Sequence, residues 1–322
     1  MHIIRGHTGI ASAWRGAVLA IGNFDGVHRG HQGLLAEVKT RAREFGTHAG
    51  VITFEPHPRE FFAPDRSHFR LTPLPLKLDL MARSGLDLAV VLTFDGGLAG
   101  LDPHGFIARI LVEALGIRHV AIGYDFRFGK GRSGDADMLQ AAGRQYGFGV
   151  GVMAPLAADG EIFSSSAIRA RLAQGDVQGA AQALGYWWRV VGTVTGGAKR
   201  GSGLGFPTAN IVLPEGTALA HGIYAARVRI GDGRYSGAAY FGNRPTFDGG
   251  ASVLEVFVFD FADDLYGREM EVAFVDFLRG DRRFDDEAAL AVQIAEDCRQ
   301  TRAALAVIEK DNPLRGLPLG AV

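Results

Sequence analysis

The first half of the chain alternates short apolar runs with segments of helical periodicity, and this alternation restricts the fold more strongly than any other feature. It predicts a mostly parallel sheet with helices on both faces, a Rossmann-like α/β domain. Ligands of such sheets bind at the carboxyl ends of the strands. The expected strands are 17–21, 50–54, 88–94, 119–123 and 148–153, and the expected helices are 30–45, 76–83, 103–115 and 135–146.

The pattern changes near Gly185. Two short helices are expected between 165 and 184, and beyond them strand-like runs follow one another without helices, which predicts a small antiparallel β-barrel. A long C-terminal helix is expected over 285–309. We therefore expect one domain over 1–185, a barrel domain with its C-terminal helix over 186–310, and a loose tail over 311–322. The expected barrel strands are 188–194, 222–230, 235–241, 253–261 and 269–277.

Bulk properties exclude several classes of protein. A length of 322 residues exceeds what one hydrophobic core usually supports. The formal net charge of -1 offers no global basic field, so neither nucleic acid nor an anionic membrane is expected as a partner. No apolar run approaches the roughly 20 residues of a membrane helix. With the single Cys298, which can form no internal disulfide, these features predict a cytoplasmic protein and leave its oligomeric state open.

The strongest local signal is Gly-Asn-Phe-Asp-Gly-Val-His-Arg-Gly-His at 22–31, which runs from a strand end into a helix start. Its glycines let the backbone approach a ligand closely, and the free N–H groups of a helix N-terminus favour phosphate. His28 and His31 are three residues apart, so both can donate to triphosphate oxygens from one face of the entry turn. The alternative is that both histidines are surface or capping residues.

Three further segments lie where a ligand of the sheet is expected. Ser-Ser-Ser-Ala-Ile-Arg at 164–169 offers hydroxyls and an arginine that can close over phosphates, although a serine N-cap has the same pattern. Thr-Phe-Glu-Pro-His-Pro-Arg-Glu at 53–60 is stiffened by prolines. Gly-Tyr-Asp-Phe-Arg-Phe-Gly-Lys-Gly-Arg at 123–132 offers aromatic rings for a planar ligand, or else a solvated basic loop over packed phenylalanines.

A glycine-rich segment with a Lys-Arg pair covers 192–210. It is not a Walker A loop, because no Gly-Lys-Ser/Thr occurs in the required frame, but its backbone N–H groups can surround phosphates. Thr208 and Asn210 point to the same side of an extended chain, and their oxygens make a partial shell for Mg²⁺ that carries ATP. A flexible hairpin is the alternative.

Glu255 lies in the otherwise apolar run Val-Leu-Glu-Val-Phe-Val-Phe at 253–259. Burying an unpaired carboxylate costs several kcal/mol, so Glu255 needs a partner or a function. It is either a general base or one half of a salt bridge at the barrel rim, for example with Arg244 or Arg279.

The four N-terminal segments, in this order over 10–185, resemble the adenylyltransferase half of the bifunctional bacterial riboflavin kinase/FAD synthetase family. The resemblance implies a nucleotidyltransferase domain in which 164–169 forms a phosphate-binding lid. The family's serine run usually ends in threonine, and Ser166 keeps the hydroxyl. The residues implied are His28, His31 and Arg169 in catalysis, Gly22, Phe24, Asp25, Gly26, Ser164 and Ser165 at ATP, and His57, Asp125, Phe126 and Phe128 at flavin.

The second half resembles the flavokinase half of the same family. The resemblance rests on Gly-Phe-Pro-Thr-Ala-Asn at 205–210, Asn-Arg-Pro-Thr-Phe at 243–247, Glu255, and Asp-Leu-Tyr-Gly-Arg at 264–268. It implies a six-stranded barrel with Glu255 as general base and flavin near Arg279. It also implies Lys199, Gly201 and Gly205 at ATP, and Thr208 and Asn210 at Mg²⁺. Tyr-Trp-Trp at 186–188 stands where the family commonly has Arg-Pro-aromatic.

The function implied is the conversion of riboflavin to FMN and then of FMN to FAD, with ATP as co-substrate of both steps. A phosphate monoester is largely dianionic at neutral pH and needs no base to attack, whereas the primary alcohol of riboflavin does. One alternative is nucleotidyl transfer to another phosphate ester, such as phosphopantetheine or glycerol phosphate, and another is a non-catalytic flavin-binding protein. The glycine-rich loop and Glu255 argue against the first, and the presence of both sets of candidate catalytic residues argues against the second.

Overall fold

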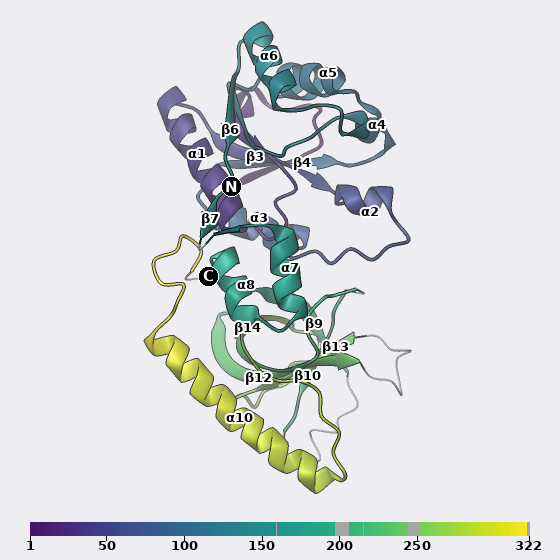
Figure 1. The fold of residues 1–322 in the computed structure, drawn as a ribbon, viewed down its shortest axis with the longest axis vertical. Helices are drawn as coiled ribbons and strands as arrows, with labels where there is room; N and C mark the ends of the chain where they lie inside the picture. The colour runs from purple at the N-terminus through teal and green to yellow at the C-terminus, as the bar shows by residue number, and fades with distance from the viewer. Residues whose placement is uncertain (159, 197–205, 215, 244–251, 321–322) are drawn as a thin grey trace. The chain divides into compact units, whose positions relative to one another are not determined.

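The computed structural model describes residues 1–158, 160–196, 206–214, 216–243 and 252–320 (Figure 1). Its contacts divide the chain into two compact units, Met1–Ser165 and Ser166–Val322. Within the described ranges, no helix combines the length and the apolar character needed to cross a bilayer.

The first unit is built on a parallel sheet. Its strands are β1 (His2–Arg5), β2 (Val18–Ile21), β3 (Ala49–Glu55), β4 (Leu88–Thr93), β5 (His119–Gly123) and β6 (Gly149–Met153), in the order β1-β4-β3-β2-β5-β6. Every neighbouring pair is parallel. Strand β2 pairs with β3 on one edge and with β5 on the other, so the strand order reverses beside its carboxyl end, where open α/β sheets bind ligands.

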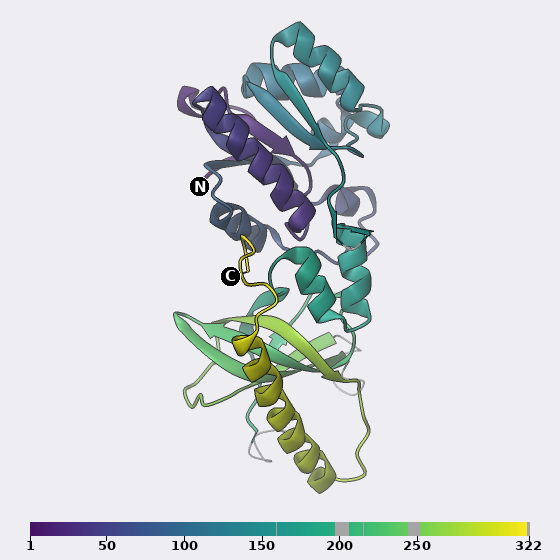
Figure 2. The same ribbon diagram turned by 60° about the vertical axis from the view of Figure 1, so that its left-hand side comes forward.

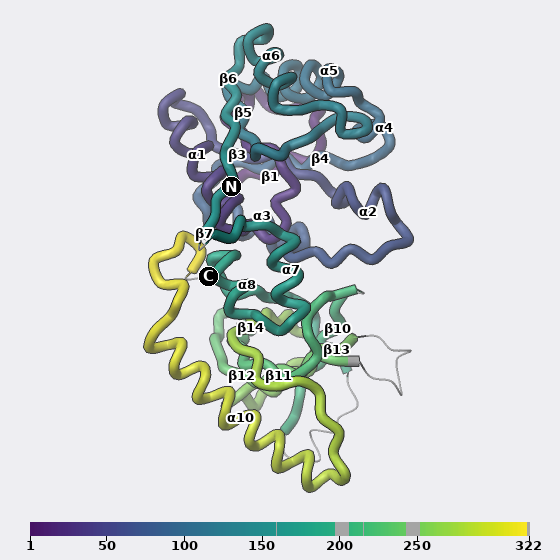
Figure 3. Tube along the Cα trace, viewed as in Figure 1, coloured from purple at the N-terminus to yellow at the C-terminus, as the bar shows by residue number. Residues whose placement is uncertain are grey.

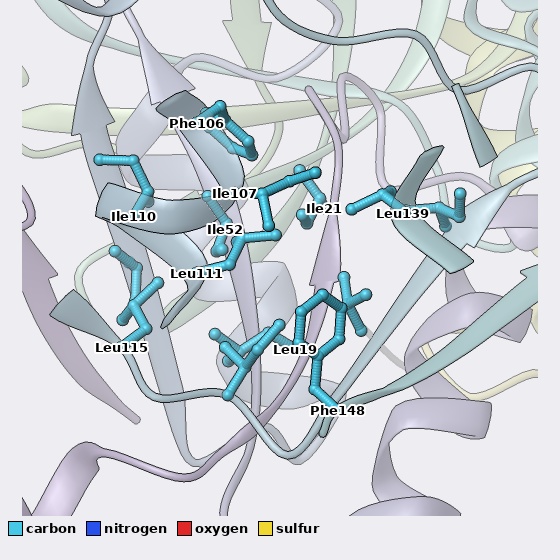
Figure 4. Packing of buried hydrophobic residues seen from close by; sticks show 14 of the residues in the cluster. Leu19, Ile21, Ile52, Phe106, Ile107, Ile110, Leu111, Leu115, Leu139 and Phe148 are labelled. Atoms are coloured by element: carbon cyan, nitrogen blue, oxygen red, sulfur yellow. The ribbon is translucent and has the colours of Figure 1, made fainter. Parts of the chain in front are cut away.

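Helices cover both faces of this sheet, which explains why its strands are apolar without interruption. Leu19 and Ile21 of β2 pack with Ile107 and Leu111 on one face (Figure 4). On the sheet, α1 packs against β2, β3 and β5, and Figure 2 shows it in purple along one face. The helices are α1 (Arg29–Phe45), α2 (Pro58–Phe62), α3 (Leu74–Arg83), α4 (Gly96–Gly100), α5 (Pro103–Gly105) and α6 (Ala136–Tyr146), with the π-helical η2 (Phe106–Ala114) and the short η1 (Ser12–Trp14) and η3 (Lys130–Arg132). A small hairpin, β7 (Ala157–Ala158) and β8 (Glu161–Ile162), follows.

The second unit is a closed antiparallel barrel (Figure 3). Its strands are β9 (Arg189–Thr195), β10 (Ala209–Val212), β11 (Gly222–Ile230), β12 (Gly233–Asn243), β13 (Ser252–Val258) and β14 (Glu269–Arg279), in the order β10-β13-β12-β11-β14-β9. Helix α10 (Glu287–Lys310) packs against β11, β12 and β14. The predicted fold class, a parallel α/β domain followed by a barrel with a long C-terminal helix, is confirmed.

The boundary between the compact units lies earlier than the change in sequence pattern near Gly185. Helices α7 (Ser165–Ala173) and α8 (Val177–Leu184) separate the two positions. Helix α8 packs against β14, and the Leu172 carbonyl of α7 accepts from the Ala220 N–H at 3.0 Å. Ala181 shares a core with Trp187 and Val275, and the amide of Gln178 donates to Asp276 Oδ1 at 2.9 Å. The sequence analysis placed these helices in a domain over 1–185, because an amphipathic pattern shows that a helix covers an apolar surface but not which one.

The expectation of a loose tail was wrong for residues 311–320. Leu314 is fully buried in the same core as Leu305 and Ile308 of α10, and Leu317 packs against it. The junction residues Tyr186, Trp187 and Trp188 are also fully buried, so the departure from the family pattern at this point is absorbed in the core of the second unit.

Candidate active sites

The loop after β2 brings His28 and His31 together at the start of α1. His28 is the N-cap residue, and its Nδ1 accepts a hydrogen bond from the His31 backbone N–H at 3.3 Å. The two imidazole rings stack with their centroids 3.6 Å apart. Because Nδ1 of His28 is an acceptor, the neutral ring carries its proton on Nε2 and offers that N–H to a ligand.

Both rings are neutral at physiological pH. Burial lowers the pKa of His28 to about 4, although Asp25 opposes the shift. Burial, and then electrostatic interactions with His28 and Lys77, hold the pKa of His31 well below its ordinary value. His31 Nδ1 is buried and has no hydrogen-bond partner in the described part of the chain. Such an atom is costly in a folded protein, and a bound ligand would satisfy it.

The backbone of this loop is strained. Phe24 and Val27 are fully buried and have φ angles of 51° and 38°, in the left-handed region that β-branched residues avoid. Gly26, at φ 86°, adopts it without cost. Strain of this kind persists only where the surroundings impose it, and it is concentrated at functional sites. A Cβ on Gly22 would lie 3.3 Å from the Phe24 ring, so this glycine fits the tight path of the loop.

Two of the predicted ATP residues, Asp25 and Ser165, make hydrogen bonds that hold this loop. Asp25 is 3% exposed, and its carboxylate accepts from the backbone N–H groups of Leu71 and Thr72 at 3.2 and 3.0 Å. The hydroxyl of Ser165 donates to the carbonyl oxygen of Asp25 at 2.8 Å, so the start of α7 meets the loop after β2. Ser164 is half-buried beside it. Arg169 is also half-buried, in the part of α7 that belongs to the second unit.

The carboxyl end of β3 holds His57, which is fully buried. It caps α2 by accepting the Arg59 N–H on Nδ1 at 3.1 Å, so its Nε2 also carries the proton of the neutral ring. Burial, and then the neighbouring His68, lower the pKa of His57 to about 4. The ring of His68 lies 4.5 Å away.

An aromatic cluster beside this strand end was not predicted. The rings of Phe61, Phe62 and Phe94 contact one another at centroid distances of 5.2 to 5.7 Å, and Phe62 is 68% exposed. Phe94 directly follows the end of β4, and the Phe-Phe pair ends α2. The signal available in the sequence was that Phe94 ends one expected strand and that the pair Phe61 and Phe62 follows another closely.

The three remaining flavin candidates of the first unit lie in the loop after β5 and differ in their exposure to solvent. Asp125 is exposed and Phe126 is half-buried, so both present surface to a ligand. Phe128 belongs to the hydrophobic core and stacks on Phe126 at 5.6 Å. The Phe128 ring therefore packs in the core and does not reach the surface.

The barrel brings together Thr208, Asn210 and Glu255. Asn210 and Glu255 are register partners of β10 and β13. The hydroxyl of Thr208 donates to Glu255 Oε2 at 3.5 Å, and the buried Asn210 donates through Nδ2 to the Thr208 carbonyl at 3.4 Å. Glu255 is half-buried, within reach of solvent. A hydroxyl, an amide and a carboxylate in contact are hard oxygen donors of the kind that Mg²⁺ prefers, so these residues fit that ion.

The other predicted residues of the second unit lie apart from this group or outside the described residues. Arg279 is held by Asp297 of α10, which accepts from Nε at 2.9 Å and from Nη2 at 2.6 Å. This pair ties the end of β14 to α10, and Glu255 is not the partner of Arg279. The predicted ATP residues Lys199, Gly201 and Gly205 fall outside the described residues, as does Arg244.

Comparison with known proteins agrees with this division. A family model described as FAD synthetase matches residues 10–167, and one described as riboflavin kinase matches residues 184–305. The bifunctional riboflavin kinase/FMN adenylyltransferase of Pseudomonas fluorescens is 41% identical over 307 residues, which cover 95% of this chain and 98% of that protein. The protein of the same name from Escherichia coli K12 is 40% identical over 299 residues, which cover 92% and 96%. The crystal structure of a macrolide-efflux protein from Streptococcus pneumoniae is similar to this one with a TM-score of 0.83 at 28% identity, and the match covers 94% of this chain and 99% of that one.

Proposed function

Because the chain belongs to the family of bifunctional riboflavin kinase/FMN adenylyltransferases, it is an enzyme of FAD synthesis with both activities, and we propose that each compact unit performs one of them. The observation that carries this proposal is that the two groups of candidate catalytic residues lie in different units. The His28–His31 stack belongs to the first unit and the Thr208–Glu255 contact to the second.

In the first unit, the phosphate of FMN attacks the α-phosphorus of ATP. A P–O bond forms there, the bond to the β-phosphate oxygen breaks, and pyrophosphate leaves. No protein base is needed, because a phosphate monoester with a second pKa of about 6 is largely dianionic at neutral pH. His28 donates through Nε2–H and His31 through its own ring N–H to the phosphate oxygens on which charge accumulates. Ser164 and Ser165 close over the phosphates.

In the second unit, the primary alcohol of riboflavin attacks the γ-phosphorus of ATP, and ADP leaves. Glu255 takes the proton of the alcohol, which is a poor nucleophile until that proton is removed. Thr208 and Asn210 would hold Mg²⁺ with the ATP phosphates, and the ion when bound neutralises part of their charge. The contact between Thr208 and Glu255 supports this assignment, because Glu255 lies beside a residue that we expect to bind Mg²⁺ and ATP.

Flavin is expected to lie in the first unit near His57, Asp125 and Phe126. The exposed Phe62, with Phe61 and Phe94, supplies aromatic surface against which the flavin ring packs. In the second unit, Arg279 contributes to the flavin site by holding the end of β14 against α10 through its hydrogen bonds to Asp297. ATP, riboflavin and FMN are the partners that we propose, in the cytoplasm and without nucleic acid or membrane, in keeping with the net charge of -1.

Two variants test the division of labour. His31→Ala should lower FMN adenylylation by about a hundredfold or more and leave riboflavin phosphorylation unchanged. Glu255→Gln should do the reverse, by about a hundredfold or more, and still convert supplied FMN to FAD. The matched controls are His104→Ala and Glu269→Gln, which change exposed residues of the same types in the same units. If both variants lose the same step, the proposal is wrong.

A further inference from the structure

The loop after β2 is held by a second segment that no sequence motif marks. This segment runs from the end of an irregular stretch into the first turns of α3 and contains Leu71, Thr72 and Lys77. We propose that it is a clamp that positions the loop for ATP, with Thr72 and Lys77 as its positioning residues. The inference rests on the proposed adenylyl transfer in the first unit.

Thr72 fixes the later part of the loop. It is fully buried, and its hydroxyl accepts a hydrogen bond from the Gly26 backbone N–H at 2.8 Å. The backbone N–H of Thr72 donates to Asp25 Oδ1 at 3.0 Å, and that of Leu71 donates to Asp25 Oδ2 at 3.2 Å. One residue thus holds both the backbone of Gly26 and the side chain that precedes it.

Lys77 fixes the earlier part of the loop. It is 2% exposed, and its ammonium donates to the Asn23 carbonyl at 2.8 Å. Within the described ranges it has no ion pair. The carboxylates of Asp25, Glu55 and Glu60 act on it from a distance, and those of Glu55 and Glu60 are also held by Arg70. An ammonium buried without a direct ion pair is costly, and an apolar residue would fill the same space more cheaply. Packing alone therefore does not explain a lysine here.

The two attachments bracket Phe24, one of the two strained residues of the loop. The Asn23 carbonyl and the Gly26 N–H lie on either side of Phe24, whose φ is 51°. The Phe24 ring meets the His31 ring edge-on at 5.2 Å. The clamp therefore holds a backbone that relaxes without it, and the backbone in turn sets the ring that supports His31. Loss of either attachment should move the histidine stack away from the phosphates.

The test separates positioning from simple stability. In the full-length chain, Thr72→Val removes the hydroxyl at nearly constant shape, Thr72→Ser keeps it, and Lys77→Met removes the ammonium. The matched controls are Thr47→Val and Lys39→Met, which remove a hydroxyl bond to the Gly16 carbonyl (2.9 Å) and an ammonium bond to the Ser84 carbonyl (2.6 Å) elsewhere in the same unit. The measurements are kcat and KM for ATP in FMN adenylylation, riboflavin phosphorylation by the same preparation, and the melting temperature.

We expect kcat/KM for ATP in FMN adenylylation to fall about tenfold to a hundredfold in Thr72→Val and Lys77→Met. Thr72→Ser and both controls should stay within about twofold of the starting enzyme, and phosphorylation should not change. The clamp is refuted if Thr72→Val lowers the melting temperature as the controls do but keeps adenylylation, and this comparison decides the matter even if Lys77→Met fails to fold. Failure of the proposed function is a separate outcome, in which His31→Ala retains adenylylation.

Discussion

The imidazole rings of His28 and His31 stack at a centroid distance of 3.6 Å with 19° between their planes. Two rings this close in a buried site repel each other strongly if both carry a proton on each nitrogen. The lowered pKa values agree with this: burial lowers the pKa of His28 to about 4 and holds the pKa of His31 well below its ordinary value. The pair is therefore neutral and can donate hydrogen bonds, and it does not act as two cations.

This neutrality predicts how the stability of the first unit depends on pH. The unfolded chain has a histidine pKa of 6.5 and the folded His28 about 4, so the unfolded state binds more protons between these values. The free energy of unfolding should therefore fall as the pH drops from 6.5 towards 4, and His28 should add no pH dependence above 6.5. By pH 4 the loss from His28 should be on the order of 3 kcal/mol.

Hydrogen exchange of peptides from the first unit in increasing urea measures this dependence. His57 contributes a slope of the same sign, because its pKa is also lowered to about 4. His28→Asn should remove part of the slope, and His104→Asn, which changes an exposed histidine, should leave it intact. A first unit whose stability rises on acidification would show that His28 is charged in the folded protein.

The pair of Arg279 and Asp297 should be worth far more to the barrel than a second pair on the same helix. Asp297 is fully buried and binds both Nε and Nη2 of Arg279, so Asp297→Asn should destabilise the second unit by about 3 kcal/mol. Asp260→Asn breaks the exposed pair with Arg302 and should cost far less than Asp297→Asn, because solvent screens the exposed charges. Urea unfolding followed by Trp187 and Trp188 fluorescence, in a Trp14→Phe background, gives both values, and equal costs would refute the assignment.

The segment after α10 should stabilise the second unit. Leu314 is fully buried against Leu305 and Ile308, so Leu314→Ala should cost about 2 to 4 kcal/mol. Val307→Ala, at a position that is 64% exposed on α10, should cost no more than about 0.5 kcal/mol. The same urea experiment compares the two variants. A neutral Leu314→Ala would mean that the segment is as loose as its composition suggests.

The sequence predicted those elements whose periodicity is long enough to be distinctive. It did not predict β1 or β10. In β10 only Ile211 and Val212 carry a strand signal, directly after a glycine-rich segment. The position of β10 is set by pairing with β9 and β13, which are contacts between residues distant along the chain.

The same limit applies to the sites. His28, His31, Thr208 and Asn210 stand in local motifs, and the motifs could be recognised without a structure. Thr72 and Lys77 act on a loop about 46 to 54 residues away, and only the fold brings them to it. The interpretation of Phe128 as a flavin contact came from the family resemblance, which does not distinguish a ring at the surface from one in the core.

The division of labour between the two units is tested most directly by mixing two inactive chains. His31→Ala and Glu255→Gln are incubated with riboflavin and Mg-ATP, separately and together, and the flavins are separated over time. We predict FMN alone from the first variant, neither product from the second, and FAD from the mixture, because FMN made by one chain is adenylylated by the other. A mixture of folded variants that forms FMN but no FAD would contradict the account.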